Sequence, residues 1–311
     1  MTNVSSITVT CAPCCWGVDD VKNPHLPSWE TVLDETVAAG FGGLELGPYG
    51  YMPLDTVLVS DALEKRGLSI IAGTIFDNLV SCDNRENLLR QTREICGLIT
   101  SLNKPRQHVG QRFDVPYLTV MDWGHDERDY AAGHSDRAVR LSGENWRQMI
   151  DNIRAIATIA RDEFGVRTTI HPHAGGYIEF ADELARLVAD IDADIAGLCL
   201  DTGHMVYSGM DPIETLDLYW DRVDYIHFKD IAPVIYDQIM SQKIRFFDAC
   251  AAGVMCPIGK GNIDYSAIRT FLTAKQYSGY ITIEQERDPR NAGSILDDLS
   301  ASRTFLKQTG F

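Results

Sequence analysis

The chain has 311 residues, of which 45% are hydrophobic and 23% are charged, and its formal net charge is −16. This composition is that of a globular protein with a large core. The negative charge argues against nucleic acid or an anionic membrane surface as partner, because both attract clustered Lys and Arg. The sequence has no long apolar run and no secretory leader, so we expect a soluble, cytoplasmic protein without membrane contact.

Short apolar runs alternate with stretches of helical spacing along the chain. We expect strands over 7–11, 43–46, 69–73, 117–121, 168–170, 197–200, 224–227 and 280–284. We expect helices over 29–39, 54–66, 86–100, 144–164, 181–189, 212–219, 265–273 and 292–306. Eight such units predict a protein of the α/β class with a single (β/α)8 TIM barrel over 1–311. A doubly wound sheet is the alternative, but no Gly-x-Gly-x-x-Gly follows the first strand.

Two connections are longer than the usual loop between a strand and the next helix. They cover 122–143, after the fourth strand, and 230–264, after the seventh. Because both follow strands, we expect both at the mouth of the barrel, as a lid, a substrate wall or a contact with a partner subunit. The aromatic and basic residues in them include Trp123, Tyr130, Lys243, Arg245, Phe246, Phe247 and Lys260.

Eight cysteines are scattered along the chain, with Cys11, Cys14 and Cys15 near the first strand. Cys11 and Cys14 form a Cys-x-x-Cys pair, but the chain has no second pair of Cys or His at the spacing of a structural zinc site. We therefore expect packed, reduced thiols, since Cys is among the residues most often buried.

Four of the expected strands end in groups that can bind a metal. A single His or Asp in a loop is more often a hydrogen-bonded turn residue, so the joint occurrence carries the prediction. The carboxyl ends of parallel strands converge on one mouth of a barrel, which would bring the four groups together. These groups are His171-Pro172-His173, Asp201-Thr202-Gly203-His204, His227-Phe228-Lys229-Asp230 and Ile283-Glu284-Gln285-Glu286.

One imidazole after the fifth strand, with Asp201, His227 and Glu284, would supply two nitrogen and two oxygen ligands. Residues i and i+2 face the same way at a strand end, so His171 and His173 are alternatives. The choice stays open; the ligand set that we carry forward contains His173, and either histidine is a candidate catalytic residue. Such a mixed set suits manganese, with cobalt, iron, magnesium and zinc as alternatives.

These motifs resemble the xylose-isomerase-like barrel superfamily of sugar isomerases and epimerases, and most closely its inosose (2-keto-myo-inositol) dehydratases. The chain also resembles the barrel subunit of bacterial deglycosidases that cleave 3-oxo-glucosides, including C-glycosides. It departs from the dehydratases at Pro172, where they have three consecutive histidines, and at Lys260, where they have an acidic residue. The resemblance is carried by Ala12-Pro13, Trp16, Asp19-Asp20, His171-x-His173, Asp201-Thr202-Gly203-His204, His227-Phe228-Lys229-Asp230 and Glu284-x-Glu286-x-Asp288-Pro289.

The resemblance implies a divalent metal, a keto-inositol or keto-sugar substrate and a β-elimination. A base removes the proton beside a ring ketone, the metal stabilises the enolate, and water or an aglycone departs. The second resemblance implies a small β-rich partner subunit, and we expect an oligomer. The implied roles are His171 or His173 as base, Glu286 or His204 as proton donor, and Glu45, Trp16 and Lys229 as substrate-binding residues.

Other functions remain as alternatives. A sugar isomerase or 3-epimerase would use the same enolate and return the proton. A metal-dependent phosphodiesterase for DNA is disfavoured by the negative charge. A non-catalytic scaffold subunit is the alternative from a different class, since fold alone does not imply function.

Overall fold

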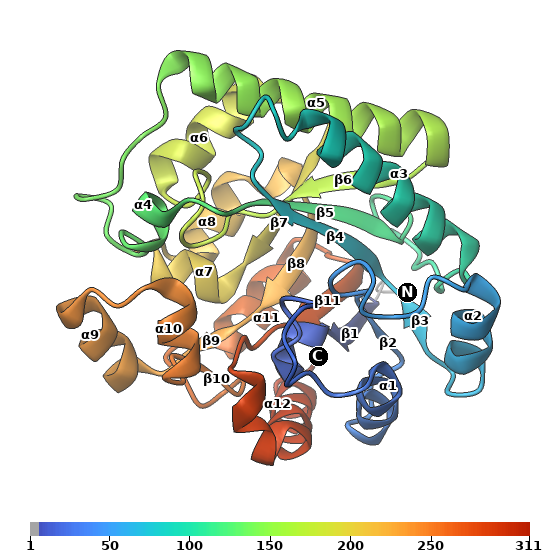
Figure 1. The fold of residues 1–311 in the computed structure, drawn as a ribbon. Helices are drawn as coiled ribbons and strands as arrows, with labels where there is room; N and C mark the ends of the chain where they lie inside the picture. The colour runs from blue at the N-terminus through green and yellow to red at the C-terminus, as the bar shows by residue number, and fades with distance from the viewer. Residues whose placement is uncertain (1–5) are drawn as a thin grey trace.

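The parallel strands close into a barrel in the computed structural model, which describes residues 6–311 (Figure 1). The hydrogen-bonded order is β3-β2-β1-β11-β8-β7-β6-β5-β4. All eight expected strands are present, and the third is divided into two. The strands are β1 (Ile7–Cys11), β2 (Gly43–Leu44), β3 (Ser69–Ile70), β4 (Ala72–Asp77), β5 (Tyr117–Asp122), β6 (Arg167–Ile170), β7 (Gly197–Asp201), β8 (Val223–Phe228) and β11 (Gly279–Ile283).

The barrel closes through Ile71, which lies between β3 and β4. Its N–H donates to the carbonyl of Leu44 at 2.9 Å, and its own carbonyl accepts from the N–H of Tyr117 at 2.9 Å. Residues 69–77 thus bond to β2 on one side and to β5 on the other. The predicted (β/α)8 barrel is confirmed, because β3 and β4 together act as its third strand.

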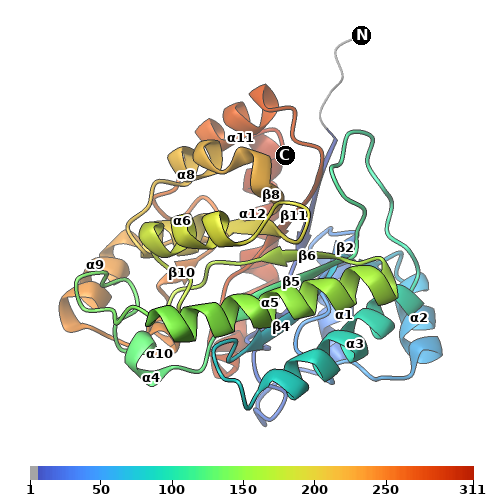
Figure 2. The same cartoon turned by 90° about the horizontal axis from the view of Figure 1, so that it is seen from above.

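The helices surround the barrel, as two perpendicular views show (Figures 1 and 2). Several begin at a side chain that accepts a hydrogen bond from the first turn, among them Asp55, which starts α2 two residues later than expected. The helices after the strands are α1 (Trp29–Ala38), α2 (Thr56–Glu64), α3 (Arg85–Ser101), α5 (Gly143–Phe164), α6 (Ala181–Asp190), α7 (Thr202–Tyr207), α8 (Pro212–Leu218), α11 (Tyr265–Ala274) and α12 (Ile295–Gln308). None of the described helices has the length and apolar character that a membrane crossing needs.

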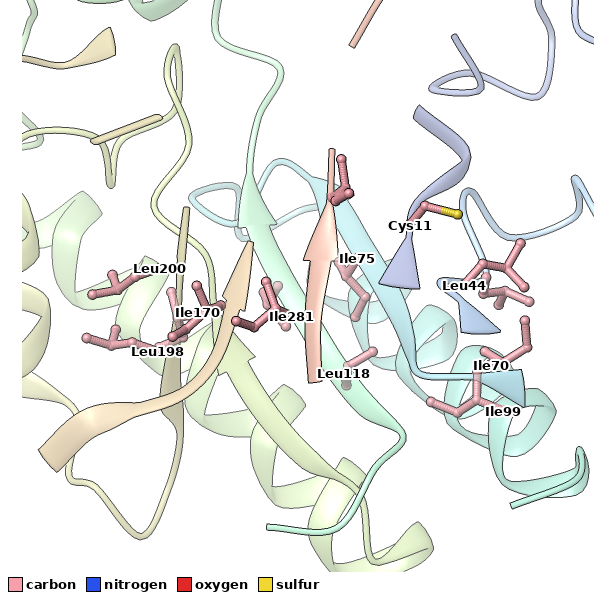
Figure 3. Packing of buried hydrophobic residues seen from close by; sticks show 14 of the residues in the cluster. Cys11, Leu44, Ile70, Ile75, Ile99, Leu118, Ile170, Leu198, Leu200 and Ile281 are labelled. Carbon is pink, nitrogen blue, oxygen red and sulfur yellow. The ribbon is translucent and has the colours of Figure 1, made fainter. Parts of the chain in front are cut away.

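The main core lies between the barrel and these helices. Aliphatic side chains of the strands and of the helices form one buried cluster there, which includes Ile75 of β4 and Ile99 of α3 (Figure 3). Alternate residues along the strands point into the barrel instead, since side chains of a strand alternate between its faces. Tyr225 of β8 demonstrates this, because its hydroxyl crosses to Glu45, just after β2, a strand that is not its neighbour.

The two long connections contain secondary structure of their own. The first includes α4 (Asp126–Asp129), and the second includes β9 (Asp230–Ile231), α9 (Pro233–Gln242), α10 (Phe246–Ala251) and β10 (Met255–Cys256). They contact each other, since Arg245 donates to Asp129 at 2.6 Å, and they lie together at one end of the molecule (Figure 1). The remaining elements are η1 (Pro13–Trp16), η2 (Trp220–Arg222) and η3 (Pro289–Ser294).

Candidate metal and catalytic site

Strand alternation aims the four candidate ligands into the barrel. Each lies two residues after a side chain that points into the barrel. Because the side chains of a strand alternate with a period of two, each candidate ligand also points inward, at the end of its strand or just after it. All four side chains are at least nine-tenths buried. The pairs are Thr169 and His171, Cys199 and Asp201, Tyr225 and His227, and Thr282 and Glu284.

One ligand atom from each of His171, Asp201, His227 and Glu284 lies within 4.8 Å of the others. His171 Nε2 is 4.0 Å from Asp201 Oδ2 and 3.9 Å from Glu284 Oε2. His227 Nδ1 is 3.1 Å from the same Glu284 oxygen. Burial and the neighbouring His227 hold the pKa of His171 well below its usual value, so this imidazole is neutral, the form that binds a metal.

The unsatisfied atoms of this cluster fit a divalent cation. His171 Nε2, Asp201 Oδ2 and His227 Nδ1 are buried and have no hydrogen-bond partner within residues 6–311. Buried polar atoms are normally paired, because each unpaired one costs about 1–3 kcal/mol. A cation between these atoms would satisfy all three, and two imidazoles with two carboxylates form a donor set that manganese or zinc accepts.

Two further contacts orient the ligands. Glu45 Oε1 lies 2.8 Å from His227 Nε2 and accepts the Tyr225 hydroxyl at 2.8 Å. Burial lowers the pKa of His227, but Cys199, Glu284 and Glu45 outweigh it and raise the pKa well above its usual value, so a metal would take the place of the proton on Nδ1. With Nε2–H donating to Glu45, the Nδ1 lone pair would then face the cluster, an arrangement common behind metal-binding histidines. Asp201 Oδ1 accepts the N–H of His204 at the start of α7 at 2.7 Å, which leaves Oδ2 for the cluster.

A second group surrounds the ammonium of Lys229. Lys229 Nζ lies 2.9 Å from His204 Nε2, 3.2 Å from Glu284 Oε2, and in contact with Glu286 Oε1. Burial would lower the pKa of Lys229, but Asp201, Glu286 and Glu284 outweigh it and raise the pKa well above its usual value. The side chain is therefore a buried cation.

Gly203 makes room for Lys229. A Cβ at position 203 would lie 2.6 Å from Lys229 Cγ, which is too close for any real contact. The glycine in the Asp201-Thr202-Gly203-His204 motif thus lets α7 pass directly over the lysine side chain.

His173 lies beside the cluster with a free proton-accepting position. Its Nδ1 is 2.8 Å from the carbonyl of Ala174, so Nδ1–H donates there and Nε2 keeps its lone pair. The rings of Phe76, Trp123 and Phe246 lie 5.0 to 5.5 Å from the His173 ring. Burial, with His204 and Lys229, lowers the pKa of His173 well below its usual value, so the ring is neutral and its Nε2 carries no proton.

A cavity of about 420 Å³ opens onto these groups. Glu45, His173, Glu284 and Glu286 line its inner part, whereas His204 and Lys229 lie outside the lining. The outer part is lined by the segment after β2 and by one face of α3. The residues there are Gly47, Pro48, Tyr49, Leu54, Asn87, Arg90, Gln91 and Glu94.

Two sequence-based assignments are placed differently by the structure. His171, and not His173, groups with Asp201, His227 and Glu284, because His173 belongs with His204 and Glu286. Trp16 is buried in the core, where its indole N–H donates to Glu35 of α1 at 2.6 Å, and it does not line the cavity.

Lys260 and the other basic residues of the long connections also lie away from the cavity lining. Lys260 borders a separate surface hollow beside α12, and Arg245 pairs with Asp129. Of the aromatic residues in these connections, Phe247 lines the cavity, and Trp123 and Phe246 pack around His173.

Sequence reasoning did not assign a site role to Cys14 or Asp19, which line the cavity next to Glu284 and Glu286. Burial raises the pKa of both side chains, with the neighbouring carboxylates adding to the effect. The signal was available, because both follow the first strand at the same mouth. All eight cysteines are free, as expected, but they are not all packed in the core, since Cys82 is exposed and Cys14 faces the site.

A buried ion network holds the loop that carries His173. Arg128 is fully buried and donates to Glu183 at 3.0 Å and to Glu179 at 3.4 Å. Glu179 connects three segments at the mouth of the barrel, because its carboxylate accepts hydrogen bonds from the N–H groups of Gly133 and Gly175 and from the Ser208 hydroxyl. No local sequence pattern marks this network, because its members are joined only in the folded chain.

Known proteins are similar to this chain over nearly its whole length. A family model described as xylose isomerase-like TIM barrel matches residues 33–308. The inosose dehydratase of Clostridium botulinum (strain Alaska E43 / Type E3) is 27% identical over 310 residues, which cover 99% of each chain.

Solved structures show the same fold at lower identity. The probable 3-DHS dehydratase AsbF, involved in petrobactin synthesis from Bacillus anthracis, aligns with a TM-score of 0.69 at 15% identity, covering 96% of this chain and 98% of that one. The IOLI protein with a bound zinc atom aligns with a TM-score of 0.69 at 13% identity, covering 97% of each chain.

Proposed function

The chain belongs to the xylose isomerase-like TIM barrel family, and from this premise we propose that it is a divalent-metal-dependent lyase acting on a cyclic keto-polyol. One observation carries the proposal: four buried ligand atoms converge beside a neutral histidine and a carboxylate that face one cavity. The relatives named inosose dehydratase support the elimination of water as the reaction.

The proposed ligands are His171, Asp201, His227 and Glu284. When bound there, a divalent ion would act as a Lewis acid toward the substrate carbonyl and offset the charge that develops next to it. Manganese is our choice for this mixed donor set, with cobalt, iron, magnesium and zinc as the alternatives.

His173 and Glu286 would carry the two proton transfers. His173 Nε2 takes the proton from the carbon next to the carbonyl, while Nδ1–H stays on the Ala174 carbonyl. As the carbon–carbon double bond forms, the carbon–oxygen bond at the β position breaks, and Glu286 relays a proton from the Lys229 ammonium, with which it is in contact, to the departing hydroxyl, which leaves as water. Lys229 holds Glu286 in place, and Glu45 is the candidate for binding a substrate hydroxyl, since it lines the cavity.

Cleavage of a 3-oxo-glucoside is the second candidate, and the size of the cavity favours it. The cavity of about 420 Å³ continues outward to Tyr49, Leu54 and Arg90, beyond the groups that would act on the ring. Cavities of about 300–1,000 Å³ accommodate drug-sized ligands, which are larger than one sugar ring. The same proton transfers would then expel an aglycone in place of water.

The test uses protein stripped with a chelator and then reloaded with Mn²⁺. Stripped and reloaded samples are assayed in parallel on 2-keto-myo-inositol and on a 3-keto-glucoside, following the enone product and the released aglycone. Turnover by the reloaded protein alone is expected, and full turnover by the stripped protein would refute metal dependence. Deuterium exchange without elimination would identify an isomerase or epimerase, and inertness toward both substrates would favour a scaffold subunit.

A further inference from the structure

The ammonium of Lys229 lies where a second metal ion would lie. Four potential ligand atoms surround Nζ, and none of them belongs to a backbone group. They are Glu286 Oε1 in direct contact, His204 Nε2 at 2.9 Å, Glu284 Oε2 at 3.2 Å and Asp201 Oδ2 at 3.8 Å. This is a set of one imidazole and three carboxylates, the same classes of donor that form the neighbouring cluster.

Two of these four residues, His204 and Glu286, also form a group with His173. His173, His204 and Glu286 each offer an atom within 4.8 Å of the other two. Glu286 Oε2 is buried and has no hydrogen-bond partner among the described residues. Glu284 and Asp201 reach Lys229 with the same oxygens that face His171, so their carboxylates belong to both groups. Two-metal sites place their ions about 3.5–4 Å apart, which requires shared or adjacent ligands of this kind.

We propose that Lys229 is a built-in cation that occupies a second metal site and keeps the centre mononuclear. Without the lysine side chain, His173, His204 and Glu286 bind a second divalent ion. The inference rests on the proposed function to the extent that the first set, His171, Asp201, His227 and Glu284, binds one ion.

Lysine suits this place for reasons of shape and charge. Its ammonium is a compact point charge at the end of a flexible stem, whereas the guanidinium of Arg is a broad plane. The stem of Lys229 is fully buried and passes under Gly203, where even a Cβ would collide with it. A resident cation also avoids leaving several buried carboxylates near one another, which would be strongly destabilising.

The experiment measures metal stoichiometry. Wild type, Lys229→Ala, Lys229→Ala/Glu286→Gln and the control Lys275→Ala are stripped with a chelator, reloaded with excess Mn²⁺, desalted and analysed by mass spectrometry for bound metal. Lys275 is a partly exposed lysine that pairs with Asp217, away from the cavity. We expect one ion per chain in wild type and in Lys275→Ala, two in Lys229→Ala, and one again in the double variant.

A spectroscopic signature gives an independent readout. Two Mn²⁺ ions at this spacing couple magnetically, so the electron paramagnetic resonance spectrum of Lys229→Ala should differ from the six-line spectrum of a single bound ion. Folding is followed by circular dichroism, with and without Mn²⁺. If Lys229→Ala does not fold, the same measurements are made on Lys229→Ser, whose hydroxyl can donate a hydrogen bond to the buried carboxylates that have lost the ammonium.

The outcomes separate the two proposals. Wild type that binds no ion would refute the metal site of the proposed function. Wild type with one ion and a folded Lys229 variant with one ion would overturn the role of Lys229 and leave the first site standing. Two ions in wild type would also overturn it, because Lys229 would then not exclude the second ion.

Discussion

Replacing His171 and His173 one at a time separates metal binding from proton transfer. Two ligands of one ion with bonds of about 2.1 Å lie at most about 4.2 Å apart. His171 Nε2 meets this limit with both Asp201 and Glu284, at 4.0 and 3.9 Å. His171→Asn should therefore lower Mn²⁺ affinity by more than about 100-fold, since loss of a residue that merely orients a ligand already costs about 10–100-fold.

His173→Asn should have the opposite profile. Its ring donates to the Ala174 carbonyl and faces the cavity, so its loss should lower kcat by about 10²–10⁴, the contribution of a positioned general base. Mn²⁺ affinity should stay close to that of wild type.

The assay is calorimetric titration of chelator-stripped protein with MnCl₂, followed by kcat at saturating Mn²⁺. His134→Asn, a change of the same kind on a histidine outside the cavity lining, should leave both quantities unchanged. Loss of Mn²⁺ binding in His173→Asn with full binding in His171→Asn would show that the assignment of the two histidines is reversed.

Three further changes test the surroundings of the site. Glu45→Gln should weaken Mn²⁺ binding by about 10–100-fold in the same titration, because Glu45 orients His227, and unchanged affinity would count against this role. Arg128→Met should lower the free energy of unfolding by about 3–5 kcal/mol in urea denaturation, because Glu179 would be left buried without its cation and Glu183 would keep only Arg140; a loss below about 1 kcal/mol would contradict this. Burial raises the pKa of Glu179 from 4.5 to about 7, so between these pH values the folded protein keeps a proton on Glu179 that the unfolded chain has lost. The free energy of unfolding should therefore fall as the pH rises from about 4.5 to about 7. Urea denaturation between pH 5 and pH 8 should show this fall, and Glu179→Gln should make it shallower; an unchanged slope in the variant would exclude Glu179 as its source.

Periodicity made the barrel and its strand ends predictable. The alternation of side chains along a strand depends only on local geometry, so Thr169, Cys199, Tyr225 and Thr282 already indicate which later residues face inward. The division of the third strand at Ile71 was not visible, because it depends on bonding to two different neighbours.

The alternation of side chains could not predict which of His171 and His173 groups with Asp201. His171 and His173 have the same parity and the same chemistry, so a pattern of period two cannot separate them. The chain turns after β6, and the N–H of His173 donates to the carbonyl of Ile178, which moves this ring toward His204 and away from Asp201. A turn of this kind is held by a distant partner, Asp122, which accepts the N–H of Tyr177.

The amino-acid sequence determined the eight-unit barrel, the four strand ends with metal-binding groups and the acidic character of the chain. These follow from composition and from short-range periodicity, which every unit repeats. Only the tertiary structure decided that His171, and not His173, groups with Asp201, His227 and Glu284, that Trp16 belongs to the core and that Lys229 lies among the carboxylates as a buried cation. Each of these depends on contacts between residues far apart in the chain, and their distances are fixed only when the barrel closes.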